Sequence, residues 1–159
     1  MFKKWFQKKE EILFAPLRGK VIPLTEVPDP TFSEKMLGEG FAILPSEGEV
    51  FSPVDGKVVQ IFPTKHAIGI QPKGGLEILI HIGLETVTME GKGFTSFVNA
   101  GDKVRVGDPL IHFSLTEVKE KAKSTITPIV ITNGKDRKIT FLDAKEVVPS
   151  QDPILSIQI

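Results

Sequence analysis

The sequence predicts an all-β fold, an antiparallel sandwich or barrel with one or two short helical turns. Turn signals made of glycine, proline, asparagine and aspartate recur every few residues along the chain. The segments between them are short and rich in Val, Ile, Phe and Thr. Many short strands at this spacing are typical of sandwiches and barrels. Glycine and proline number 14 and 12 of 159 residues, a balance that favours turns over long helices.

The first fourteen residues differ in character from the rest of the chain. Phe2, Trp5 and Phe6 fall at helical spacing among several lysines. Such a segment forms either a small basic amphipathic helix that touches an anionic membrane surface or a flexible leader. The chain is therefore divided into a leader at residues 1–14 and a single domain at residues 15–159.

Within the domain, strands are expected at four segments of high β-propensity: residues 57–62, 76–83, 109–115 and 127–132. Only residues 116–124 are expected to be helical, because Thr116 is a suitable N-cap and a charged run follows it.

One pattern occurs twice, since residues 14–21 and 51–58 share Phe, Pro, Gly, Lys and Val in register. Two copies are too few for a solenoid. Either the sheet is built from two similar halves, or turns that lead into strands simply reuse proline and glycine.

Charge and composition exclude several classes of function. Twenty basic and twenty acidic residues give a formal net charge of zero, so the long-range field of a nucleic-acid binder is missing. The chain has no cysteine, which excludes a disulfide framework, a thiolate zinc site, an iron-sulfur cluster and a cysteine nucleophile. No apolar run approaches the roughly 18 residues of a membrane-spanning helix, so we expect a soluble protein in the reducing cytoplasm.

Two of the three histidines, His66 and His81, lie in neighbouring segments that look like strands, residues 65–71 and 76–83. If these strands form a tight hairpin centred on Lys73-Gly74, residues whose numbers sum to 147 face each other, and His66 faces His81. Their Cβ atoms would then lie roughly 5 Å apart on one face of the sheet. Two adjacent rings cannot both be protonated without repulsion, so at least one neutral, nucleophilic imidazole is expected near neutral pH. His112 has no such partner and is interpreted as structural.

The face of this hairpin that lies opposite the histidines is expected to form the core surface. It carries the apolar residues Leu76, Ile78, Ile80 and Ile82 together with Ala67 and Gly69.

Few kinds of chemistry suit a histidine pair in this sequence. An intrinsic metal centre is unsupported, because two imidazoles are one ligand short of a catalytic zinc site. The chain has no nucleophile elbow, no convincing carboxylate pair and no P-loop. Covalent catalysis by histidine remains, and phosphoryl transfer suits it because positioning and charge stabilisation dominate that reaction.

Several motifs extend this interpretation to a family. Three of them are residues 64–67 (TKHA), 79–87 (LIHIGLETV) and 90–94 (EGKGF). In these motifs the sequence resembles the glucose-type enzyme IIA component of the bacterial phosphoenolpyruvate-dependent sugar phosphotransferase system. Further matches in the same order lie at residues 15–16, 27–29 with Phe32, 52–56, 101–104 with 107–108, and 121–124.

The resemblance implies a compact antiparallel β-sandwich of the barrel-sandwich hybrid type. It implies a cytoplasmic phosphotransferase component that acts through a phosphohistidine. Its donor would be the histidine phosphocarrier protein and its acceptor the IIB domain of a sugar permease. Regulated metabolic enzymes or transporters are further partners that the family suggests, nucleic acid is not one, and membrane contact would come through the permease or weakly through the N-terminus.

The resemblance also implies a role for each matching residue. His81 matches the phosphoacceptor, which reacts through Nε2, His66 matches the histidine that supports onward transfer, and Thr64 matches the residue that orients this second ring. The acidic residues Asp29 and Glu85 would meet a basic partner. The residues that match the apolar docking rim are Phe32, Phe62, Leu79 and Val87.

The sequence departs from its relatives at three places near this site. Glu85 stands where relatives carry Asp, Leu79 where an aromatic residue occurs, and Lys65 where Asn is found. These changes would alter affinity for partners without touching the reacting nitrogen. The resemblance implies no cofactor of the chain's own, although in some relatives the two histidines bind zinc together with a carboxylate of a regulated enzyme.

Two alternatives come from other classes of protein. Residues 53–58 and 101–110 also resemble the paired motifs of biotinyl and lipoyl carrier domains, yet no exposed lysine tripeptide lies at a hairpin tip between them. A lysostaphin-like zinc peptidase would share the sandwich fold, but the metal ligands that it needs are missing.

Overall fold

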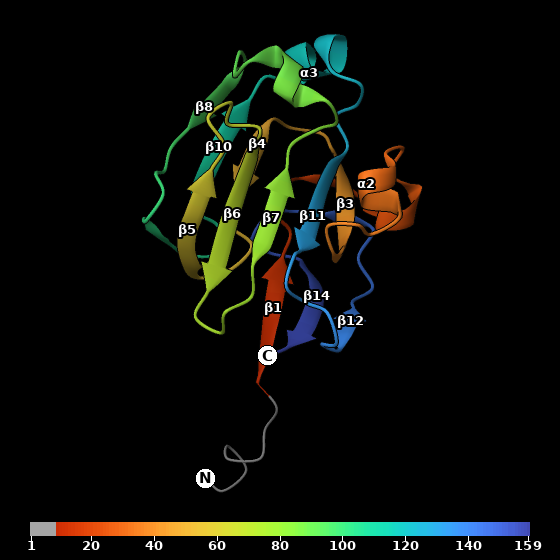
Figure 1. Ribbon diagram of the computed structural model, residues 1–159, viewed down its shortest axis with the longest axis vertical. Helices are drawn as coiled ribbons and strands as arrows, with labels where there is room; N and C mark the ends of the chain where they lie inside the picture. The colour runs from red at the N-terminus through yellow and green to blue at the C-terminus, as the bar shows by residue number, and fades with distance from the viewer. Residues whose placement is uncertain (1–8) are drawn as a thin grey trace, which may run out of the picture.

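The computed structural model describes residues 9–159, and antiparallel strands dominate this range (Figure 1). The strands are β1 (Glu10–Phe14), β2 (Gly19–Pro23), β3 (Glu39–Pro45), β4 (Glu49–Phe51), β5 (Gly56–Ile61), β6 (Ala67–Pro72), β7 (Ile78–His81), β8 (Phe94–Ser96), β9 (Lys103–Val104), β10 (Pro109–Phe113), β11 (Thr127–Ile131), β12 (Ile139–Phe141), β13 (Glu146–Val147) and β14 (Pro153–Gln158). The helices are α2 (Pro30–Ser33) and α3 (Leu115–Lys121), and the 3₁₀ turns are η1 (Leu24–Glu26) and η2 (Thr86–Met89). The predicted all-β sandwich with short helical turns is confirmed.

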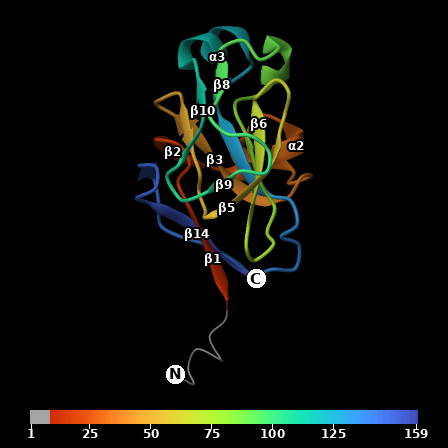
Figure 2. The ribbon, with the colours of Figure 1, turned by 90° about the vertical axis from the view of Figure 1, so that its left-hand side faces the viewer.

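The strands form one large sheet and two small ones. The eight-stranded sheet has the order β13-β2-β3-β11-β7-β6-β5-β9, and Figure 2 shows its edge at β5 and β9. The small sheets have the orders β1-β14-β12 and β4-β10-β8. Buried residues from all three sheets form one apolar core between them. Within residues 9–159, none of the helices has the length and apolar content needed to span a bilayer.

The large sheet has the same sequence of strand pairings when it is followed from either edge. β13 pairs with β2 as β9 pairs with β5, β2 pairs with β3 as β5 pairs with β6, and β3 pairs with β11 as β6 pairs with β7. The repeated sequence pattern occupies corresponding places, because Val21 lies opposite Ile43 on β3 and Val58 lies opposite Ile70 on β6. Of the two interpretations of the repeat, the sheet built from two similar halves is the one that the large sheet supports.

The two copies of the pattern also bind each other. Phe14 N–H donates to the Pro53 carbonyl at 3.0 Å, and Phe51 N–H donates to the Pro16 carbonyl at 2.8 Å. Each half then anchors a later turn of the chain: Ala15 N–H donates to the Asp152 carbonyl at 2.8 Å and Ser52 N–H to the Asp108 carbonyl at 2.9 Å.

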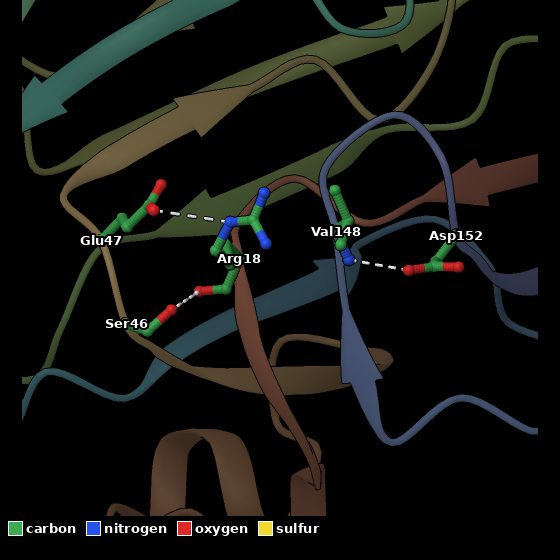
Figure 3. A network of polar contacts seen from close by, with 5 residues as sticks. All are labelled: Arg18, Ser46, Glu47, Val148 and Asp152. Atoms are coloured by element: carbon green, nitrogen blue, oxygen red, sulfur yellow. Dashed lines mark hydrogen bonds and ion pairs between the residues drawn. The ribbon is translucent and has the colours of Figure 1, made fainter.

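Each of these two aspartates closes its own turn with its carboxylate. Val148 N–H donates to Asp152 Oδ2 at 2.7 Å (Figure 3), and Arg105 N–H donates to Asp108 Oδ2 at 2.9 Å. The ion pair between Arg18 Nε and Glu47 Oε1 in the same view spans 3.5 Å between half-exposed side chains, so it adds little stability.

The pairing of β6 with β7 differs from the expected register by one residue, although Leu76, Ile78, Ile80 and Ile82 lie in the core as expected. Ala67 lies opposite His81 and Ile68 opposite Ile80, so residue numbers in this ladder sum to 148 rather than 147. The loop between β6 and β7 explains this difference. In this loop, Gly75 N–H donates to the Pro72 carbonyl, and Glu77 N–H donates to the side chain of Asn133 instead of pairing with β6. The strands are therefore joined by a longer loop than a tight hairpin has.

Because of this register, the fully buried face of the hairpin consists of isoleucines, and Ala67 and Gly69 lie on the outer face rather than with the core as expected. The buried residues are Ile68, Ile70, Ile78 and Ile80, each no more than 1% exposed. On the outer face, Leu79 packs against a second apolar cluster: Leu24, Val27, Phe32, Ala42, Leu84 and Val130. Leu24 comes from η1, Val27 directly follows η1 and Phe32 comes from α2, so this segment covers that part of the sheet.

The predicted leader at residues 1–14 extends too far into the domain. Residues 10–14 form β1, which pairs with β14, and Leu13 is fully buried in the core. The alternation of exposed and buried residues along β1 places this segment in the small sheet. The predicted basic amphipathic segment around Trp5 lies outside the described residues.

The helix expected at residues 116–124 begins and ends earlier. α3 spans Leu115–Lys121, and Ser114 rather than Thr116 is its N-cap, because Ser114 Oγ accepts the N–H of Glu117 at 3.2 Å. Ala122 is extended and ends the helix.

We expect Ile80→Ala to lower the free energy of unfolding by about 2–5 kcal/mol, because it opens a cavity under the centre of the large sheet. Ile12→Ala is the matched control: its side chain also lies on a strand but is 42% exposed, so a loss of about 1 kcal/mol or less is expected. Urea unfolding followed by circular dichroism measures both. Equal losses would contradict this description of the core.

Candidate functional site

The two predicted histidines lie side by side although their strands are not in the expected register. The ring centroids of His66 and His81 are 5.0 Å apart, and the ring planes meet at 76°. His81 is the last residue of β7, and His66 immediately precedes β6. The predicted adjacency of the two rings is thus present in the structure.

A tight turn brings His66 to this position. Phe62 N–H donates to the Ala67 carbonyl at 3.0 Å, Lys65 N–H donates to the Phe62 carbonyl at 2.7 Å, and Lys65 has the left-handed φ of 58°. Ile82 N–H then donates to the His66 carbonyl at 2.7 Å, which extends the hydrogen bonding beyond the end of β7. His66 is therefore fixed by its main chain rather than by strand pairing, and it is only 5% exposed.

Each imidazole uses its Nδ1 atom in a hydrogen bond. Nδ1 of His66 bonds with Oγ1 of Thr64, the residue that the sequence analysis assigned to orient this ring. Nδ1 of His81 lies 2.8 Å from the carbonyl oxygen of Gly83. Because a carbonyl oxygen can only accept, Nδ1 of His81 carries the proton, and the lone pair of the neutral ring is left on Nε2.

Burial keeps both rings neutral. It lowers the pKa of His66 to about 4, and the neighbouring His81 contributes to this shift. Burial also lowers the pKa of His81, against the opposing effects of the Gly83 carbonyl and the carboxylate of Asp29. At neutral pH the site therefore holds two uncharged imidazoles, one of which has a free nucleophilic nitrogen.

Most of the other predicted site residues surround the histidines. A hollow of about 250 Å³ next to His81 is lined by Asp29, Thr31, Phe32, Leu37, His81, Glu85, Thr86 and Val87. The Phe32 ring lies 5.2 Å from the His81 ring, and the Phe62 ring lies 5.5 Å from the His66 ring. Asp29 is also the N-cap of α2, since its Oδ1 accepts the N–H of Thr31 at 3.0 Å.

The predicted docking residues differ in exposure. Val87 is 54% exposed at the rim of the hollow, whereas Phe32 is only 3% exposed and belongs to the floor. Leu79 does not line this hollow; with Phe62 it lines a neighbouring hollow of about 330 Å³ over β5, β6 and β7.

Some features of the site were not predicted from the sequence. Leu37 lines the hollow and is 39% exposed, but nothing in its local sequence marks it. The Gly83 carbonyl is a main-chain group, and its role depends on the left-handed φ of 69° at this glycine. The glycine two residues after His81 was the only available signal.

The third histidine, His112, lies on β10. This residue, expected to be structural, has a half-exposed side chain, and its Nδ1 is 4.0 Å from Glu49 Oε1. Within the described range, no three or more His, Cys, Asp or Glu side chains gather in a way that could hold a metal ion.

Comparison with known proteins identifies the family. The family described as "phosphoenolpyruvate-dependent sugar phosphotransferase system, EIIA 1" matches residues 11–137, which include both histidines and most of the strands around them. The chain belongs to this family. Enzyme IIA (EIIA) components are phosphotransfer proteins, and this membership favours the phosphotransfer prediction over the carrier-domain and zinc-peptidase alternatives.

Individual relatives of the EIIA family match over nearly the whole chain. A glucose-specific EIIA component of the phosphotransferase system from Halalkalibacterium halodurans is 56% identical over 144 residues, covering 84% of this chain and 83% of the relative. One from Staphylococcus epidermidis is 46% identical over 165 residues, covering 100% and 99%. The solved structure of glucose permease IIA from Mycoplasma capricolum matches with a TM-score of 0.86 at 44% identity, covering 95% of this chain and 97% of that one.

We expect the free energy of unfolding to fall as the pH drops from about 6.5 towards 4. In this window the unfolded chain binds a proton at position 66 that the folded chain does not, because the folded pKa is about 4 and the ordinary value is 6.5. In His66→Gln the free energy of unfolding should depend less steeply on pH, because only the contribution of His81 remains. Urea titrations at several pH values measure both slopes, and identical slopes would contradict the buried, neutral His66.

Proposed function

We propose that the chain accepts a phosphoryl group on Nε2 of His81 from the histidine phosphocarrier protein. It then passes the group to the IIB domain of a glucose-type sugar permease. We choose glucose because the relatives from Halalkalibacterium halodurans and Staphylococcus epidermidis are named glucose-specific. The observation that carries the proposal is the 2.8 Å hydrogen bond from Nδ1 of His81 to the Gly83 carbonyl, because it leaves Nε2 unprotonated. We place both transfers in the cytoplasm.

Each transfer is a displacement at phosphorus, in which one N–P bond forms or breaks at Nε2 of His81. The lone pair on Nε2 of His81 attacks phosphorus, and a new N–P bond forms as the N–P bond of the donor's phosphohistidine breaks. The bonding electrons return to the donor's ring nitrogen. In the onward step, a nucleophile of the IIB domain attacks phosphorus and the electron pair returns to Nε2 of His81. Neither step needs a metal ion or a base, so positioning and charge stabilisation dominate.

His66 supports this chemistry from the side. When the Thr64 hydroxyl donates to Nδ1 of His66, the neutral ring carries its proton on Nε2. With the rings 5.0 Å apart, that N–H is in position to donate to an oxygen of the phosphoryl group on His81. The charge that develops on the group during onward transfer is stabilised in this way.

The surface around His81 suits a basic protein partner with an apolar contact patch. Val87 and Leu37 supply exposed apolar area beside the reacting ring. Asp29 and Glu85 supply negative charge to the same hollow. Burial of this surface excludes water from the transfer, while the carboxylates steer a basic partner towards it. The same surface would serve the donor, the acceptor and any regulated metabolic enzyme or transporter in turn.

A zinc ion shared with a partner fits the same residues only in part. His66 and His81 offer two imidazoles, and no third ligand joins them in the described range. A carboxylate from a partner protein would be needed to complete a site. The zinc would then link the two proteins by binding side chains of both. Because it would occupy the lone pair of His81, it would also block phosphoryl transfer.

The first test is phosphorylation itself. Incubation with phosphoenolpyruvate, enzyme I and the histidine phosphocarrier should add one phosphoryl group, seen by intact mass as an acid-labile, alkali-stable adduct. His81→Ala should carry no adduct, whereas His66→Gln should form one and pass it poorly to a IIB domain. Absence of the adduct on the wild type, with the donors active on a known acceptor, would refute the proposal.

The second test concerns docking. Val87→Ala should raise the KM for the phosphorylated donor by up to about tenfold with little change in kcat, because less apolar area is buried in the complex. Phe141→Ala is the matched control, since Phe141 is 50% exposed on β12 and outside the hollow. Transfer rates at several donor concentrations separate KM from kcat. An equal effect of both variants would contradict this placement of the docking surface.

A further inference from the structure

We infer that Thr86 and Thr127 are positioning residues for phosphoryl transfer, because their hydroxyl groups clamp the peptide that precedes Gly83, the residue whose carbonyl holds the tautomer of His81. The inference rests on the proposed function, since it assigns these threonines to the orientation of the nitrogen that accepts phosphate. Neither residue needs to touch the phosphoryl group or a partner protein.

Both peptides that flank Gly83 are held by hydrogen bonds, and the two threonines clamp the first of them. In the peptide between Ile82 and Gly83, the carbonyl accepts from Thr86 Oγ1 at 2.6 Å and the N–H donates to Thr127 Oγ1 at 3.4 Å. In the next peptide, the Gly83 carbonyl accepts from His81 and the N–H of Leu84 donates to the Ser124 carbonyl at 2.9 Å. All four polar groups therefore have partners.

Both threonines are fully buried, so their hydroxyl groups are directed by the protein and not by solvent. Thr127 Oγ1 donates its hydrogen to the Thr125 carbonyl at 3.0 Å, which leaves a lone pair for the N–H of Gly83. The Thr86 methyl group packs on the same glycine, because its Cγ2 lies 2.7 Å from where a Cβ on Gly83 would stand.

The clamp is needed because Gly83 has no conformational preference of its own for this geometry. Its φ is 69°, and glycine can leave this region for many others at little cost. If the peptide rotates, the carbonyl turns away from Nδ1, and the neutral ring of His81 no longer favours one tautomer. A ring with its proton on Nε2 has no lone pair there and cannot attack phosphorus.

The experiment compares Thr86→Val with Thr86→Ser. Two-dimensional ¹H–¹⁵N correlation through the imidazole ring of the unphosphorylated protein reports which nitrogen of His81 carries the proton. Wild type and Thr86→Ser should show the proton on Nδ1, whereas Thr86→Val should show a mixture of tautomers. The rate of phosphoryl uptake should fall about tenfold in Thr86→Val with the donor KM unchanged, because the hydroxyl is buried away from the partner.

Thr88→Val is the matched control for the tautomer measurement. Thr88 lies in the same 3₁₀ turn and its Oγ1 also donates to a carbonyl, but this carbonyl is that of Glu85, at 2.8 Å, and not one in the peptides that flank Gly83. It should leave the proton of His81 on Nδ1. Should Thr86→Val fail to fold, Thr127→Val and Thr127→Ser carry the same comparison through the other hydroxyl.

The outcomes separate this inference from the proposed function. A folded Thr86→Val with wild-type tautomer and wild-type uptake rate overturns the positioning role while leaving phosphoryl transfer intact. Failure of the wild type to take up phosphate refutes the proposed function, and the tautomer measurement, which needs no donor, still decides whether the threonines hold the ring.

Discussion

The site depends on the register between β6 and β7, and buried isoleucines hold that register. Ile68 lies opposite Ile80 and Ile70 opposite Ile78, with all four side chains in the core. A slip of one residue would turn these side chains to the outer face and turn His81 inwards. The outward direction of His81, the packing of Leu79 beneath α2 and the approach of Phe32 to the imidazole all follow from this one pairing.

Burial and hydrogen bonding together determine the chemical state of the histidines. Apolar surroundings disfavour protonation of either ring, and the Nδ1 partners then decide which nitrogen keeps the hydrogen. A carbonyl at His81 and a hydroxyl at His66 allow complementary tautomers, with a lone pair on one Nε2 and a hydrogen on the other. In the proposed transfer, one ring is the nucleophile and the other the hydrogen-bond donor.

The sequence carried more information about the residues of the site than about its backbone. The all-β class and the strands β5, β7, β10 and β11 follow from turn spacing and β-propensity, and the proximity of His66 and His81 follows once their two segments are paired. The register between β6 and β7 could not be predicted in this way, because in the loop after Pro72 the N–H of Glu77 binds Asn133, a residue far away in the sequence. The position of His66 required a left-handed Lys65, which no residue type signals. Asp29 was expected as a charge for a partner, and its capping of α2 depends on a one-turn helix that periodicity cannot detect.

The small sheet that contains β1 and β14 has a consequence for synthesis of the chain. The first strand of the described range, β1, pairs with the last, β14, and Ala15 is bonded to Asp152. A nascent chain that still lacks β14 leaves Leu13 and one face of the core uncovered. Native closure therefore waits until β14 has left the ribosome, and these long-range pairings make folding slow relative to a helical protein of equal size.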